Sequence, residues 1–147
     1  MAAELVLMGM AMLAVAGDGT LESLERKYRQ QKVQDRPCYA ESTIYDLFYH
    51  DSGVPRVAIG DAWRQAARIL QVHPGQLRPG DRLTGTLGFP TRLRGSRSDV
   101  DRLIRHTHAQ SASRREPILI RLRTLNDVIG VLARVPGRSL VALGRDS

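Results

Sequence analysis

The sequence contains a single cysteine, only two lysines and 5% aromatic residues. Because Cys38 has no second cysteine to pair with, a disulfide scaffold within the chain and a metal site built on cysteine pairs are both excluded. Beyond residue 17 the chain has no hydrophobic run that suits a bilayer, which excludes a polytopic membrane protein. The chain has 147 residues, of which 42% are hydrophobic and 25% charged. This length and composition are typical of one small globular domain with an appendage.

The positive charge of the chain is arginine charge, and it is unevenly distributed. The formal net charge is +7, and of 22 basic residues only Lys27 and Lys32 are lysines. Residues 92–123 carry nine arginines and three acids. Such a surface attracts anions, whether phosphates, acidic lipid headgroups or an acidic protein. A solvated basic face without a specific partner is the alternative interpretation.

Residues 1–17 form an apolar segment that is too short to span a bilayer comfortably. The twelve residues 5–16 are apolar apart from Gly9, and as a helix they would extend about 18 Å, against a hydrocarbon core of about 30 Å. No basic residue precedes them, as one would in a signal peptide. The segment packs on the domain, lies in a membrane interface, or is the remnant of a longer anchor. We therefore expect a cytoplasmic protein, with membrane contact through residues 1–17 as an open alternative.

The pattern of apolar residues predicts a mainly α-helical protein. A polar spacer helix is expected from Leu21 to about Gln34, capped by Asp18 or Thr20. Further helices are expected over residues 42–49, 55–71, 98–109 and 125–135. Their apolar stripes are Ile44, Leu47 and Phe48; Val57, Ile59, Trp63, Ala66, Ala67 and Leu70; Val100, Leu103, Ile104 and Thr107; and Leu125, Val128, Ile129, Leu132 and Val135.

Hydroxyl residues mark the starts of the last two helices, and an ordered loop precedes them. Ser98 is expected to cap one helix, and Thr124 and Asp127 form a capping box for the other. The loop over residues 72–83 contains two prolines and two glycines, so we expect it to be held in place by burial of Leu77 and Leu83.

Other segments of the sequence predict little chemistry. Within residues 117–123, Ile118, Ile120 and Leu122 alternate with Leu119 and Arg121, as they would in a short strand or an extended connector. His73 is interpreted as a turn residue, and His106 and His108 are a poor metal pair because residues two apart do not share a helix face. Cys38 is either a reactive thiol or an inert one.

The order of these parts resembles an acyl carrier protein. A helix ending in AARILQV is followed by the loop HPGQLRPGDRL, the Leu87–Gly88 pair, another helix and a last helix headed TLNDVI. The family's loop reads v-x-P-x-x-L-x-P-x-D-x-L, followed by L-G, and its final helix carries T-h-x-D-h-h, where h is apolar. The resemblance covers roughly residues 55–135. The aromatic segment before it, residues 45–55, is similar to that of bacterial carrier-like proteins.

The family's attachment residue is where this sequence departs from the pattern. Carriers hold a phosphopantetheine arm on the serine of an Asp-Ser-Leu triplet at the head of the second helix, and no such triplet occurs here. The nearest hydroxyls are those of Thr91, Ser96 and Ser98, which are the candidate attachment residues that the resemblance implies. Arginines flank this region, whereas carriers are acidic there, so docking on basic partner enzymes is not expected.

The fold prediction is therefore a small acyl-carrier-like helical bundle with an N-terminal apolar helix and a polar linker helix. The expected divisions are an apolar helix and basic linker over residues 1–36, a carrier-like domain over 37–136 and a tail over 137–147. The expected function is that of a non-catalytic interaction module, with no cofactor, no metal and a protein partner with an acidic surface. A phosphopantetheine-bearing carrier with an atypical hydroxyl, and a basic protein that binds nucleic acid or a membrane surface, are the alternatives. Nucleic acid is disfavoured because few aromatics lie among the arginines.

Overall fold

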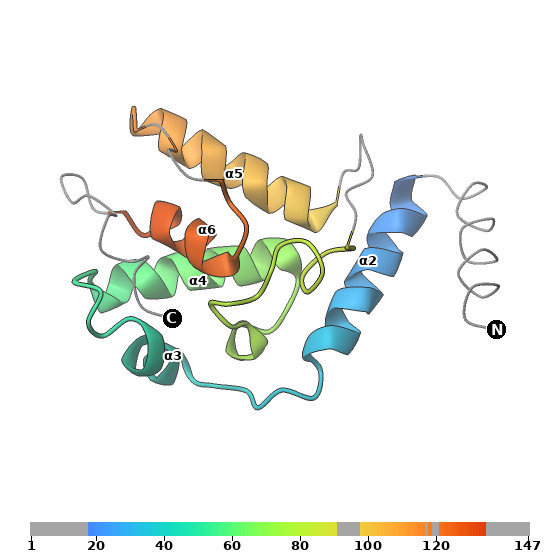
Figure 1. The fold of residues 1–147 in the computed structure, drawn as a ribbon, viewed down its shortest axis with the longest axis horizontal. Coiled ribbons are helices and arrows are strands. Elements are labelled where there is room, and N and C mark those ends of the chain that lie inside the picture. The colour runs from blue at the N-terminus through green and yellow to red at the C-terminus, as the bar shows by residue number, and fades with distance from the viewer. Residues whose placement is uncertain (1–17, 91–97, 117, 119–120, 135–147) are drawn as a thin grey trace.

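The computed structural model describes residues 18–90, 98–116, 118 and 121–134 (Figure 1). The described chain is mainly helical, as the sequence predicts, and its described residues form one isolated β-bridge but no strand. The elements are α2 (Asp18–Val33), α3 (Glu41–Phe48), α4 (Arg56–Leu70), the 3-10 turn η1 (Pro74–Gln76), α5 (Asp99–Ser113) and α6 (Leu125–Leu132). The expected apolar helix within residues 1–17 and the tail over residues 137–147 lie outside the described residues.

Helix α4 is the centre of the bundle. It contacts α3, η1, α5 and α6, and α5 also contacts α6 (Figure 1). Of the α4 stripe that periodicity predicts, all but Val57 is buried, with Ala66 and Leu70 fully buried and Ile59 3% exposed. Trp63 is 1% exposed, meets the ring of Tyr49 edge-on and donates its indole N–H to the Pro74 carbonyl at 2.8 Å. The tryptophan therefore joins three segments of the bundle.

At the ends of α3 and α4, three side chains that the sequence assigns to apolar faces are exposed instead of buried. Ile44 and Tyr49 are buried, but Leu47 is 58% exposed, Phe48 42% and Val57 71%. Leu47 and Phe48 lie in the last turn of α3, and Val57 lies in the first turn of α4. A periodic stripe predicts which way a side chain faces, but not how far the neighbouring helix extends to cover it.

The loop after α4 is held by the two leucines that the sequence singled out. Leu77 is fully buried and Leu83 is 1% exposed. Residues 81–84 run antiparallel to residues 121–125, with Leu83 N donating to the Arg123 carbonyl at 2.9 Å and Leu125 N donating to the Asp81 carbonyl at 2.8 Å. Residues 121–123 are thus the extended connector rather than a strand.

The predicted caps of α5 and α6 are confirmed, whereas α2 spans Asp18–Val33, so Asp18 and Thr20, its predicted caps, lie within the helix. The Ser98 hydroxyl accepts from Asp101 N at the start of α5. Thr124 and Asp127 form the complete capping box of α6. These caps fix where the chain turns into each helix.

Helix α2 is present as predicted, but it packs on the bundle and is more than the polar spacer that its few apolar residues indicate. It stands across the end of the bundle where α5 begins (Figure 1). Arg29 is fully buried, Val33 is 1% exposed, and the Tyr28 hydroxyl donates to the Gly85 carbonyl at 2.7 Å. The helix is therefore attached mainly by polar side chains, a mode of packing that hydrophobic periodicity does not report.

We expect Leu77→Ala to lower the free energy of unfolding by about 2–5 kcal/mol, because it empties a fully buried position. Denaturant unfolding monitored by circular dichroism would measure the loss. The matched control is Leu47→Ala, at a 58% exposed position, where we expect a change within about 0.5 kcal/mol. Equal losses in the two variants would contradict the anchoring role of Leu77.

Candidate functional site

The described candidate attachment hydroxyl, Ser98, is occupied as a helix cap. Its Oγ accepts from Asp101 N at 3.2 Å and donates to the Asp101 carboxylate at 3.0 Å, and the residue is 6% exposed. A buried capping hydroxyl does not favour attachment of a prosthetic group. Thr91 and Ser96 lie outside the described residues.

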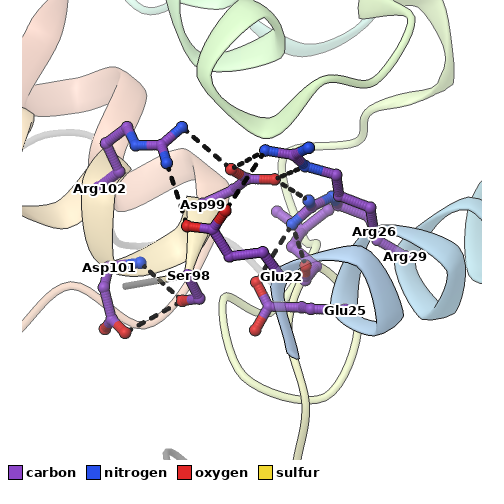
Figure 2. Close-up of polar contacts among 9 residues, drawn as sticks. Glu22, Glu25, Arg26, Arg29, Ser98, Asp99, Asp101 and Arg102 are labelled. Carbon is purple, nitrogen blue, oxygen red and sulfur yellow. Dashed lines mark hydrogen bonds and ion pairs between the residues drawn. The ribbon is translucent and has the colours of Figure 1, made fainter. Parts of the chain in front are cut away.

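Next to Ser98, the carboxylate of Asp99 accepts hydrogen bonds from arginines of two helices, α2 and α5 (Figure 2). Arg29 of α2 donates to Asp99 Oδ2 at 2.7 Å, and Arg26 donates to the same oxygen at 2.9 Å and to Oδ1 at 3.3 Å. Arg102, one turn along α5, donates to Oδ1 at 3.2 Å and also reaches Glu22 of α2 at 3.3 Å. The head of α5 is therefore engaged with α2.

The Arg29–Asp99 pair is buried, and its remaining hydrogen-bond capacity is largely used. Arg29 also donates to the Leu87 carbonyl at 2.9 Å, and its Nη1 lies 3.5 Å from Glu25 Oε1. Burial by itself would raise the pKa of Asp99, but the hydrogen bond from Arg26 and the charges of Arg29 and Arg102 outweigh it, so the pKa lies below the usual value. Burial is also the largest influence on Glu25 and raises its pKa, with the charge of Arg29 only partly opposing it.

A second cluster fastens the linker before α3 to the loop after α4. Tyr39 N donates to the Gly75 carbonyl at 3.0 Å, and the Arg78 guanidinium lies 4.0 Å from the centre of the Tyr39 ring. Arg36 donates to the Asp81 carboxylate at 2.8 Å. A side chain at Gly75 would place its Cβ 2.5 Å from both Cys38 Sγ and the Tyr39 carbonyl oxygen, so this contact requires glycine.

The exposed Cys38 thiol lies in this cluster beside an imidazole. Its Sγ is 3.0 Å from His73 Nδ1, which also accepts from Gly75 N at 3.1 Å as the cap of η1. His73 Nδ1 therefore contacts both the Gly75 amide and the Cys38 thiol. The turn interpretation of His73 is confirmed. Its contact with Cys38, 35 residues away, was not predicted from the sequence.

Three arginines converge on a surface pocket of about 400 Å³ that we call the arginine pocket. Its lining residues are Arg82, Thr84, Arg121, Leu122 and Arg123. The two antiparallel segments each place a leucine inward, Leu83 at 1% and Leu122 at 9% exposure. The pocket lies where these two segments meet, so its lining joins Arg82 and Thr84 of one segment to Arg121 and Arg123 of the other.

The guanidinium groups of the arginine pocket have no ion-pair partner among the described residues, although most other described arginines do. The two nearby acids are already engaged. Asp81 accepts from Arg36 and from Arg78 N, and Asp127 accepts from Arg123 N and Thr124 N. The sequence located Arg121 and Arg123 in its basic region, but it did not associate Arg82 and Thr84 with them.

Within the described ranges, no group of three or more His, Cys, Asp or Glu side chains is arranged to hold a metal ion. None of the helices over the same ranges combines the length and apolar character that a membrane span requires. The arginine pocket brings three guanidinium groups and one hydroxyl together on one surface hollow, a lining that suits an anion.

We expect Asp99→Asn to destabilise the protein by about 3–5 kcal/mol, because it leaves Arg29 buried without a counter-charge. Glu25→Gln, on the same network, keeps an acceptor and removes a carboxylate whose charge is disfavoured, so we expect a change within about 1 kcal/mol. Urea unfolding at pH 7 measures both. A larger loss in Glu25→Gln than in Asp99→Asn would contradict the central role of Asp99.

The same two variants separate the pH dependence of the network. Asp99 has a lowered pKa in the folded protein, so its contribution is present above the unfolded value of about 3.9 and is lost as pH falls through the folded pKa. Glu25 has a raised pKa, so its contribution is present below the unfolded value of about 4.3 and is lost as pH rises through the folded pKa. Unfolding from pH 3 to 7 should show Asp99→Asn closest to the original protein at the acid end. The stability of Glu25→Gln should rise relative to that of the original protein as pH rises. Opposite trends in either variant would contradict the directions of these pKa shifts.

A scan against protein-family models finds no match, and searches of the curated proteins and of the solved structures find none either.

Proposed function

We propose that this chain is a non-catalytic, carrier-like helical domain that acts as a protein interaction module and binds an acidic segment of a partner in the arginine pocket. The observation that carries the proposal is the convergence of Arg82, Arg121 and Arg123, without an acid partner in the described chain, on one pocket. Clustered guanidinium groups attract carboxylates and bind them in pairs of hydrogen bonds. The acidic partner supplies the counter-charge that the described domain lacks there.

The two segments that carry the arginine pocket are joined to each other and packed on the core, which favours recognition over diffuse attraction. The backbone bridge between Arg82 and Thr124, with its flanking hydrogen bonds, fixes their register. Buried leucines hold each segment against the core. A preorganised surface loses less conformational entropy when it binds.

The non-catalytic part of the proposal rests on the two places where chemistry would be sought. Ser98, the described candidate for a prosthetic group, is a buried cap. Cys38 and His73 form a nucleophile and base pair, but Nδ1 is shared with Gly75 N and no described side chain orients the other ring nitrogen. A catalytic pair requires an oriented base, so this contact supports a structural role better than a catalytic one.

We expect Arg121→Glu to weaken binding of a fluorescein-labelled, glutamate-rich peptide by at least about tenfold, because it reverses one of three converging charges. Fluorescence anisotropy at 0.15 M salt would measure the affinity of the full chain. The matched control is Arg105→Glu, which makes the same change in net charge at an exposed α5 position that does not line the pocket. Screening at this salt limits charge effects to roughly 8 Å, so the control should lose much less affinity.

Two results would overturn the proposal. Equal losses in Arg121→Glu and Arg105→Glu would show that the peptide responds to net charge alone. An increase in intact mass by one phosphopantetheine arm, after coexpression with a phosphopantetheinyl transferase, would show an authentic carrier instead of a non-catalytic module. Substituting Thr91, Ser96 and Ser98 in turn would then locate the arm.

A further inference from the structure

The charge of the arginine pocket exceeds what a single carboxylate can neutralise. Arg82, Arg121 and Arg123 line it together with the hydroxyl of Thr84, and the described lining residues include no carboxylate. Asp81 and Asp127, the acids nearest in sequence, are held by Arg36 and by backbone N–H groups. A carboxylate brings one negative charge and two oxygens to this set of donors.

We propose that the arginine pocket binds a phosphate monoester carried on a side chain of the acidic partner, which deepens the proposed function and rests on it. A phosphorylated side chain carries about −1.5 to −2 charge at pH 7 and three acceptor oxygens. That matches three guanidinium forks and one hydroxyl better than a glutamate does. The pocket, at about 400 Å³, lies within the range of roughly 300–1,000 Å³ typical of ligand sites, so the phosphate and the side chain that bears it have room.

Other carriers of phosphate fit the lining less well. Single-stranded nucleic acid binds on aromatic side chains that stack with bases, and no aromatic side chain is among the lining residues that the structure describes. A membrane surface favours exposed apolar side chains beside the basic ones, whereas Leu122, the apolar side chain among the described lining residues, is buried. The arginines also surround one hollow instead of forming a stripe along a helix, which suits a terminal dianion better than a row of phosphodiesters.

The test uses the full chain and three peptides that share one acidic sequence, with phosphoserine, glutamate or serine at the centre. We expect the phosphoserine peptide to bind at least about tenfold more tightly than the glutamate peptide at 0.15 M salt. Arg82→Ala and Arg121→Ala should reduce that preference to less than about threefold, while Arg105→Ala should leave it unchanged. Free phosphoserine should also shift the amide resonances of residues 82–84 and 121–123 at lower concentration than free glutamate does.

The outcomes separate this inference from the proposed function. If the glutamate and phosphoserine peptides bind equally well and Arg121→Ala weakens both, the phosphate inference is overturned and the acidic-partner function stands. If neither free phosphoserine nor any peptide acts on the pocket resonances, both proposals are overturned. Tighter binding of single-stranded DNA, or of vesicles containing phosphatidylserine, through the same three arginines would replace the phosphorylated protein with that ligand class.

Discussion

The ion pair between Arg29 and Asp99 determines how the N-terminal part of the described chain meets the bundle. Both residues are almost completely buried, and removing two charges from water costs several kcal/mol per ion unless hydrogen bonds replace the lost hydration. Here the replacement is extensive, because Arg29 also reaches the Leu87 carbonyl and Asp99 also receives Arg26 and Arg102. Helix α2 has too few apolar side chains to be positioned by hydrophobic burial, so directional polar contacts position it.

Asp81, in the loop after α4, joins separate segments of the chain as Asp99 does. Its side chain holds Arg36 of the linker and Arg78 N, while its carbonyl accepts from Leu125 N at the start of α6. The linker, the loop and the last helix therefore meet at one aspartate. This junction sets the register in which Arg82 faces Thr124, and that register brings the arginines of the two segments into one pocket.

Much of the fold could be predicted because it depends on local signals. The stripe of α4, the caps at Ser98 and Thr124, and the burial of Leu77 and Leu83 follow from neighbouring residues. The burial of Arg29 could not be predicted in this way, because an arginine on a polar helix looks solvated until its partner, 70 residues away, is known. The exposure of Leu47 and Val57 depends similarly on where other helices end.

The arginine pocket could be predicted from the sequence only in part. Each of its segments carries a local signal, a leucine flanked by polar residues at alternate positions, in residues 82–84 and again in 121–123. That signal predicts which side chains point outward together on one segment, but it does not predict that the two segments pair.

Pairing the segments creates a repulsion that an anion would relieve. Three guanidinium groups around one hollow repel one another, and solvent exposure screens that repulsion without abolishing it. Any ligand that binds the folded domain and not the unfolded chain also stabilises the fold, in proportion to the logarithm of its concentration over its dissociation constant. An anion in the arginine pocket would therefore strengthen the same backbone bridge that forms the pocket. Binding of an anion and the attachment of the 121–125 segment to the loop would in this way be one equilibrium.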